Sequence, residues 1–127
     1  MIDNETYNRL KQLNIEDLIW IIYIGIIILS FYSNSLERKY FIFKDKKDKN
    51  KYRRINIIIF SILLVVYIYF LNNSLNDFKN LKSTDSYKKK KLVYLSFLGS
   101  LFISISGFIF LYIAIVDNDL DTEIAFN

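Results

Sequence analysis

The chain has 127 residues, of which 53% are hydrophobic, 17% aromatic and 24% charged. This hydrophobic fraction is high for a soluble domain, so we expect the charged residues to be segregated into blocks. The sequence contains no His and no Cys, which excludes disulfides, thiolate nucleophiles, His- or Cys-ligated zinc and the usual neutral-pH proton relays. We therefore expect no enzyme activity, no catalytic residue, no cofactor and no metal site. The lack of Pro and the abundance of Ile, Asn and Lys are typical of AT-rich genomes.

Three segments, residues 18–32, 55–71 and 92–116, contain no Asp, Glu, Lys or Arg. A helix needs about 20 apolar residues to cross a bilayer, and about 17 to 25 is the working range. The third segment is long enough, the second is at the lower limit, and the first reaches it when it is extended to 15–36. A soluble fold would have too little polar chain to cover three such segments. The sequence therefore predicts an all-α membrane protein, integral and multi-pass, with three transmembrane helices at 15–36, 55–71 and 92–116.

The rest of the chain consists of polar segments with distinct charge. They are an amphipathic interfacial segment at 1–14, a basic loop at 37–54, a basic loop at 72–91 into which the preceding helix can extend, and an acidic tail at 117–127. We expect Asn14 to cap the first transmembrane helix and Thr84 or Asp85 to cap the third, because such side chains accept the free N–H groups of a helix start.

The two loops hold every Lys and Arg except Arg9 and Lys11. Because cytoplasmic loops are enriched in Lys and Arg, both loops favour the same side of the membrane, which three spans do not allow. Three resolutions remain: the first span dominates and leaves the N-terminus outside, the middle segment is a re-entrant hairpin, or the protein inserts in both orientations. We favour the first, because the middle segment has no Gly or Pro on which to turn back.

Some of these cations directly flank the transmembrane segments. We expect this group to contact anionic lipid headgroups: Arg38, Lys39, Arg53, Arg54, Lys88, Lys89, Lys90 and Lys91. The alternative is a stop signal for insertion without lipid specificity, and we give that alternative more weight. Nucleic acid is not an expected partner, because no recognition motif accompanies the basic loops.

The third segment has a face of small residues. On a helical projection they lie within an arc of about 160°: Ser96, Gly99, Ser100, Ser104, Ser106, Gly107 and Ala114. In a membrane, small residues let helix backbones approach closely, so this arc predicts helix packing. The partner is either another span of the same chain, which we favour, or a second protein.

Polar residues also recur at helical spacing at the end of the first segment: Ser30, Ser33, Asn34 and Glu37. This stripe could contact another helix, but we expect it to mark the point where the helix leaves the bilayer for water.

These features predict a small integral membrane protein with a structural or accessory role in assembly or scaffolding. Its expected partners are the lipid bilayer and either a second copy of the chain or a partner membrane protein. The alternative is an oligomeric pore or small channel in which Ser96, Ser100 and Ser104 line a wet path.

Overall fold

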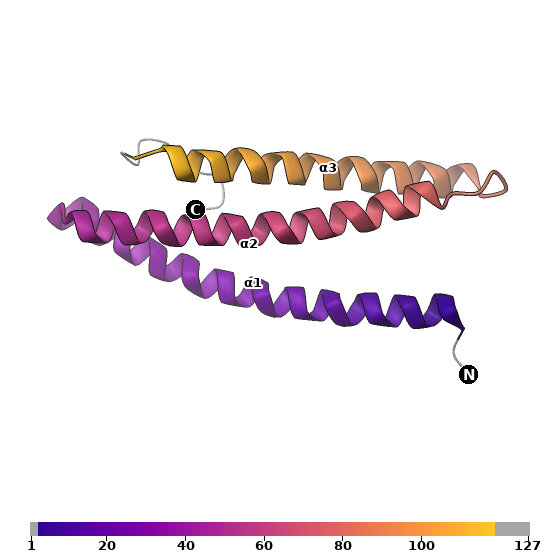
Figure 1. Ribbon diagram of the computed structural model, residues 1–127, viewed down its shortest axis with the longest axis horizontal. Helices are drawn as coiled ribbons and strands as arrows, with labels where there is room; N and C mark the ends of the chain where they lie inside the picture. The colour runs from indigo at the N-terminus through magenta and orange to yellow at the C-terminus, as the bar shows by residue number, and fades with distance from the viewer. Residues whose placement is uncertain (1–2, 119–127) are drawn as a thin grey trace.

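The computed structural model describes residues 3–118, and this part of the chain is all-helical. It contains α1 (Asn4–Phe43), α2 (Lys46–Lys79) and α3 (Tyr87–Val116), which lie lengthwise beside one another (Figure 1). At 1.5 Å per residue the shortest, with 30 residues, is about 45 Å long. Each of the three is long and apolar enough to cross a membrane, which confirms the predicted fold class.

The basic segment 37–54 is helical except for Lys44 and Asp45, so the prediction of a loop there is wrong. Lys44 ends α1 in the left-handed conformation, with φ 58° and ψ 30°, and its backbone N–H donates to the carbonyl of Tyr40 at 2.7 Å. Asp45 then starts α2, because its carboxylate accepts the N–H of Lys47 at 2.9 Å. Lys and Arg are good helix formers, so a run of cations does not end a helix.

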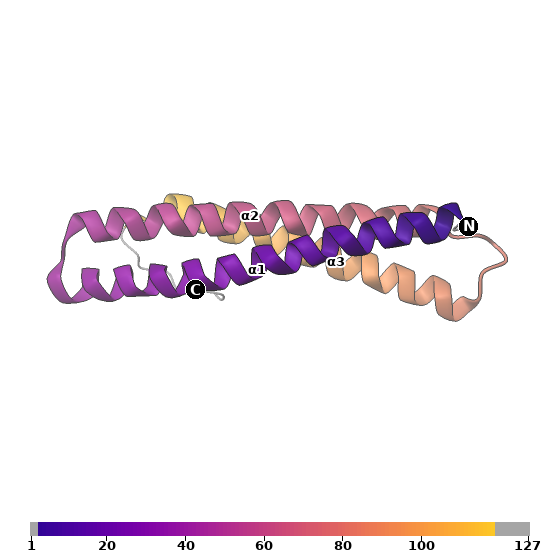
Figure 2. The same cartoon turned by 90° about the horizontal axis from the view of Figure 1, so that it is seen from below.

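The middle segment belongs to one uninterrupted helix, α2, and not to a re-entrant hairpin. As the sequence allowed, α2 continues past its apolar part, to Lys79. Figure 2 shows the α1–α2 turn at one end of the molecule and the connection between α2 and α3 at the other.

The first and third helices begin at other residues than the sequence suggested. Asp3 caps α1 by accepting the N–H of Thr6 at 2.7 Å, so residues 4–14 are continuous with the first apolar segment and Asn14 lies inside the helix. Ser86 caps α3 by accepting the N–H of Lys89 at 3.1 Å. Asp85 instead accepts the N–H of Lys82 at 2.8 Å, and this hydrogen bond lowers the pKa of its carboxyl.

We expect Ser86→Ala to destabilise the start of α3 by about 1 kcal/mol, because the N–H of Lys89 loses its acceptor. Ser83→Ala, in the same connection, is the matched control, since no hydrogen bond of the Ser83 hydroxyl is present among residues 3–118. Amide hydrogen exchange of residues 87–90 measures the effect. Equal exchange rates in the two variants would show that Ser86 does not cap the helix.

Helices α2 and α3 pack through three pairs of residues spaced seven apart. The hydroxyls of Ser74 and Ser100 lie 2.9 Å apart, and Phe60 packs with Ala114. Between them, a Cβ on Gly107 would lie 3.0 Å from the Tyr67 ring, which is tighter than an ordinary contact, so the glycine favours this close approach. A seven-residue spacing is that of a left-handed coiled coil.

Helices α1 and α2 pack through a second stripe with the same spacing. The buried residues of α1 include Ile19, Ile26 and Ser33, and the Ser33 hydroxyl donates to the side-chain oxygen of Asn56 on α2 at 2.9 Å. Ser33 therefore lies in a helix contact, and the expectation that its stripe only marks an exit to water is wrong. Tyr52, Ile59 and Val66 lie on the same face of α2 as Asn56 and are also buried.

The two stripes on α2 are neighbours. Buried Ile59 and Val66 belong to the stripe that faces α1, whereas Phe60 and Tyr67, one residue further on, face α3. One residue of helix is a rotation of about 100°, so α1 and α3 are held on sides of α2 about 100° apart. This explains why α1 and α3 do not pack against each other within the described residues.

Candidate functional site

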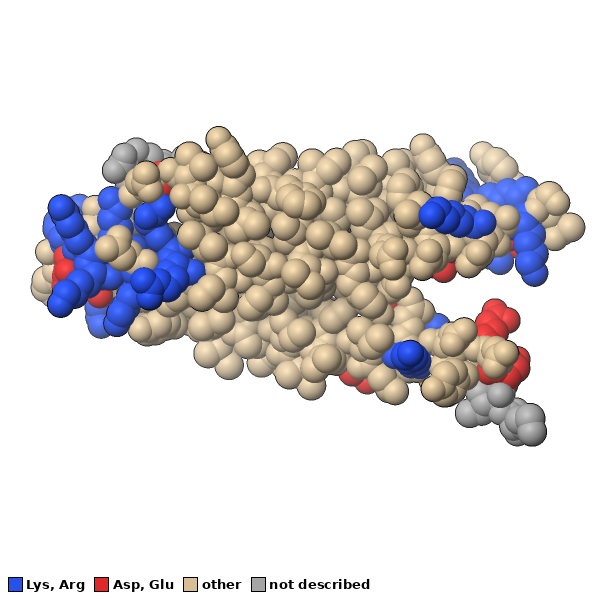
Figure 3. All heavy atoms as spheres, viewed as in Figure 1, with Lys and Arg blue, Asp and Glu red and all other residues tan. Residues whose placement is uncertain are grey.

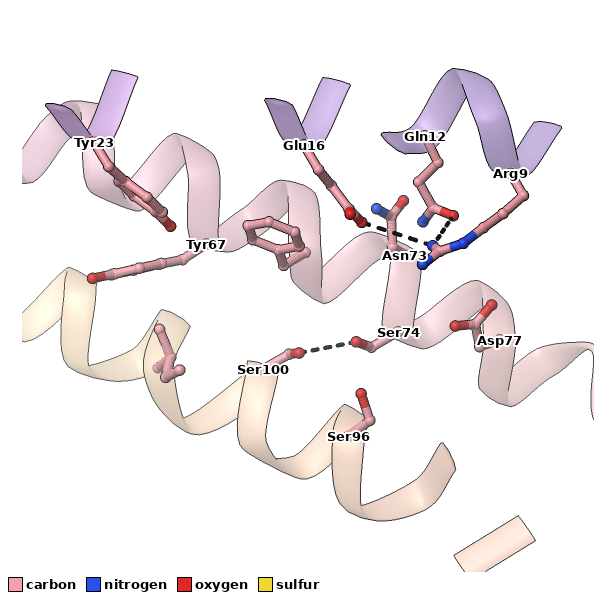
Figure 4. Close-up of a pocket in the computed structure, with 12 residues that line it drawn as sticks. Arg9, Gln12, Glu16, Tyr23, Tyr67, Asn73, Ser74, Asp77, Ser96 and Ser100 are labelled. Atoms are coloured by element: carbon pink, nitrogen blue, oxygen red, sulfur yellow. Dashed lines mark hydrogen bonds and ion pairs between the residues drawn. The ribbon is translucent and has the colours of Figure 1, made fainter. Parts of the chain in front are cut away.

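A polar cleft of about 350 Å³ lies between the three helices, toward the end where α1 begins. Figure 4 shows side chains from all three helices around it. Its polar lining residues are Arg9, Gln12, Glu16, Asn73, Ser74, Asp77, Ser96 and Ser100, and Tyr23 and Tyr67 line it as well. We call it the polar cleft below. A wider opening between the start of α1 and the end of α2 continues it, lined in addition by Glu5, Asn8, Lys11, Ile15, Tyr69, Asn76 and Asn80.

The α1 side of the cleft carries a hydrogen-bonded ion pair. One terminal nitrogen of Arg9, Nη1, donates to the side-chain oxygen of Gln12 at 3.0 Å and lies 3.8 Å from a carboxylate oxygen of Glu16 (Figure 4). Both contacts use the same nitrogen of Arg9. The other guanidinium N–H groups therefore remain available to a further acceptor.

On the α2 side, two polar side chains lack such partners. The amide nitrogen of Asn73 is fully enclosed and has no hydrogen-bond acceptor among the described residues. Asp77 is exposed, and among residues 3–118 its carboxylate has no ion pair and no hydrogen-bond donor. With Arg9 paired to Glu16, Asp77 leaves the cleft with one uncompensated negative charge.

The cleft lies beside an apolar stretch of α3. The Ser74–Ser100 hydrogen bond fixes the antiparallel register, which places Asp77 level with Phe97 and Asn73 level with Leu101. Leu95 and Phe102, in this stretch, are exposed large hydrophobic residues. The apolar part of α3 begins at Leu92. Measured along the helix axis, Asp77 therefore lies about 8 Å past the start of this apolar part. The apolar segments of α1 and α2 do not reach this level.

The cleft forms because the packing stripe between α1 and α2 changes character along its length. In its middle the stripe is apolar, with Ile19 and Ile26 on α1. Seven residues before Ile19, and on the same face, the stripe continues with Gln12, which cannot be buried without hydrogen-bond partners. At this end α1 separates from α2, and Figure 3 shows a notch there.

Only part of the small-residue face of α3 packs inside the molecule. Ser104, Gly107 and Ala114 are buried against α2, and the Ser104 hydroxyl donates to the carbonyls of Ser100, at 2.9 Å, and of Tyr67, at 3.3 Å. The remaining members, Ser96, Gly99, Ser100 and Ser106, are exposed or half-buried, and Ser96 and Ser100 line the polar cleft. A Cβ on Gly99 would meet no atom within 4 Å.

A second, apolar pocket of about 230 Å³ lies between α2 and α3. It is lined by Phe60, Tyr67, Ile103, Ser106, Gly107 and Phe110, and we call it the apolar pocket. Tyr67 and Ile103 also line the polar cleft, so the two cavities are adjacent. The apolar pocket and the polar cleft together form a groove along α2, on the side that neither α1 nor α3 covers.

The predicted lipid-contacting cations lie at both ends of the molecule, separated by an apolar middle (Figure 3). Arg38, Lys39, Arg54, Lys88 and Lys91 are exposed. Three others have contacts within the chain. Arg53 donates to the carbonyl of Ile115 at 3.1 Å, Lys89 pairs with Asp85 at 3.3 Å, and Lys90 donates to the carbonyl of Ser83 at 3.1 Å. Arg53 therefore ties α2 to the end of α3.

Four residues of the cleft were not predicted as site residues from the sequence: Gln12, Glu16, Asn73 and Asp77. A signal was present, because Gln12 continues the seven-residue spacing of Ile19 and Ile26 toward the N-terminus, and Glu16 lies four residues after Gln12 on the same face of the helix. Residues 3–118 contain no group of three metal-ligating side chains. Of the acidic tail, only Asp117 and Asn118 are among the described residues.

Comparisons of the chain with protein-family models, with curated proteins and with solved structures find no match.

Proposed function

We propose that the chain is an integral, multi-pass membrane protein with a non-enzymatic accessory role, and that the open groove is the surface by which it binds another membrane component. The length and hydropathy of all three helices support the membrane location. The apolar middle with cations at both ends has the pattern of a bilayer-spanning protein.

One observation carries the binding role: α1 and α3 pack on α2 but not on each other. In the groove between them, Ser96 and Ser106 line the two cavities, and Gly99, between them in sequence, is exposed. Small residues at a lipid-exposed position let another molecule approach the backbone closely. The groove therefore supports binding more than the outward faces of α1 and α3, which carry large side chains such as Trp20 and Phe102.

A photocrosslinking amino acid at position 106 tests this proposal in membranes. We expect a discrete adduct of defined mass at position 106, and a mixture of lipid adducts at the exposed position 105, which lines neither cavity. The same heterogeneous mixture at both positions would contradict a binding groove. Release of the protein from membranes by alkaline carbonate would contradict the membrane location.

A pore formed by several copies is the second candidate, because the polar cleft extends to a level where α3 is apolar. Ser100 and Ser104 are hydrogen-bonded to α2 or to α3 itself, whereas the Ser96 hydroxyl has no hydrogen bond among residues 3–118. Conductance in planar bilayers that Ser96→Leu abolishes would favour the pore. Silent bilayers, with a discrete adduct at position 106, would favour the accessory role.

A further inference from the structure

The polar cleft and the apolar pocket together have the layout of an amphipathic ligand. The cleft, of about 350 Å³, presents charged and amide groups, whereas the pocket, of about 230 Å³, presents Phe60, Phe110 and Gly107. The shared residues Tyr67 and Ile103 join the two. A molecule with a polar head and an apolar chain can occupy both at once.

The unpartnered groups in the cleft are of two kinds. The enclosed amide nitrogen of Asn73 and the remaining N–H groups of Arg9 are hydrogen-bond donors, so both can bind an acceptor. Beside the positive charge of Arg9, an anionic acceptor is favoured. The carboxylate of Asp77 has no cation among the described residues, so it calls for a positively charged donor. A ligand head with both an anionic and a cationic group satisfies both needs.

The position of the cleft indicates that this ligand comes from the membrane. Asp77 and Asn73 lie level with Phe97 and Leu101, within the apolar part of α3. Polar groups at such a level usually face a wet cavity or a bound ligand, because exposure to hydrocarbon is costly. Since α1 and α3 do not pack together, the groove is open sideways and a lipid can enter without leaving the bilayer.

We propose that the groove binds a phospholipid whose head carries a phosphate and a primary ammonium, such as phosphatidylethanolamine. Arg9 and Asn73 bind the phosphate, Asp77 accepts hydrogen bonds from the ammonium, and one acyl chain lies in the apolar pocket beside Gly107. This inference rests on the groove's being the binding surface of the proposed function and adds the identity of the ligand.

Native mass spectrometry of the full-length, delipidated protein in detergent tests the proposal. The probes are phosphatidylethanolamine, phosphatidylglycerol, which lacks the ammonium, and phosphatidylcholine, whose ammonium has no N–H. We expect phosphatidylethanolamine to bind about tenfold more tightly than either, which corresponds to one charge-assisted hydrogen bond.

Two variants test which residues bind the head group of the lipid. Asp77→Asn is expected to remove the preference for phosphatidylethanolamine over phosphatidylglycerol, and Asp17→Asn, an exposed acid that does not line the cleft, is expected to keep it. Arg9→Gln is expected to weaken all three phospholipids by about tenfold, because all three carry the phosphate. Lys88→Gln, outside the cleft, should change none of them.

A third variant tests whether the acyl chain lies in the apolar pocket. Ser106→Leu fills the apolar pocket and is expected to weaken every phospholipid without changing their order, whereas Ile109→Phe, on an exposed position outside the pocket, should have no effect. Far-UV circular dichroism of each variant verifies that the helices remain.

Equal affinity for the three phospholipids, or an unchanged preference in Asp77→Asn, would overturn the proposed ligand. If this occurred while position 106 still gave a discrete protein adduct, the groove would bind a partner helix, and the proposed function would stand without the lipid. No discrete adduct at position 106 and no lipid binding would overturn both proposals.

Discussion

Replacing Gly107 by leucine is expected to lower the free energy of unfolding by about 2 kcal/mol relative to the same change at Gly99. A Cβ at position 107 would lie 3.0 Å from Cδ2 of Tyr67 and 3.2 Å from Cδ1 of Leu64, so these side chains must shift, and the larger leucine side chain increases the overlap. At Gly99 a Cβ would meet nothing within 4 Å, and leucine there adds only its better helix propensity. The two variants therefore separate the steric effect from the backbone effect.

Unfolding by sodium dodecyl sulfate in mixed micelles, followed by circular dichroism, gives this difference. If both leucine variants shifted the unfolding curve equally, Gly107 would not be a contact between α2 and α3. If only Gly99→Leu destabilised the protein, that result would instead indicate a partner on the outward side of Gly99.

The second large effect is expected at the buried hydrogen bond between α1 and α2. Ser33 is completely buried and Asn56 is 4% exposed, and their side chains are 2.9 Å apart. Ser33→Ala leaves the oxygen of Asn56 without its donor, and we expect a loss of about 1 to 2 kcal/mol. Ser30→Ala is the matched control, because the Ser30 hydroxyl donates only to the carbonyl of Ile26 in its own helix, at 2.8 Å.

The double variant Ser33→Ala with Asn56→Leu removes both polar groups at once. We expect it to be more stable than Ser33→Ala alone, because two apolar groups in place of a hydrogen-bonded pair leave nothing unsatisfied. The same mixed-micelle unfolding measures the coupling, for which we expect about 1 kcal/mol. Strictly additive effects of the two substitutions would show that the bond contributes nothing.

The three apolar segments could be predicted from the sequence because the absence of charge over a long stretch is a property of composition alone. The ends of the helices could not, since they depend on single side chains. Lys44 takes a left-handed conformation that usually favours Gly, and Asp3, far from the apolar segment, caps α1. No local pattern distinguishes these residues from their polar neighbours.

The predicted small-residue face of α3 is divided between two surroundings in the structure. Ser104 and Gly107 face α2, whereas Ser96 faces the cleft. This division depends on the position of α1 around α2. A helical projection of α3 alone carries no information about that position. The two stripes on α2 also lie one residue apart, so their periodicities overlap in the sequence and neither is visible by itself.

The unequal apolar lengths of the helices have a further consequence for the surrounding bilayer. The apolar part of α3, residues 92–116, is about 37 Å long, while that of α1, residues 18–32, is about 22 Å. At the α1–α2 turn the apolar segments end close together, so the difference falls on the opposite leaflet. If all three helices span a bilayer, as we propose, the lipids of that leaflet meet a longer apolar surface at α3 than at α1, which is a hydrophobic mismatch around one molecule. The protein would therefore impose a local gradient of membrane thickness, with the polar cleft at its steepest point.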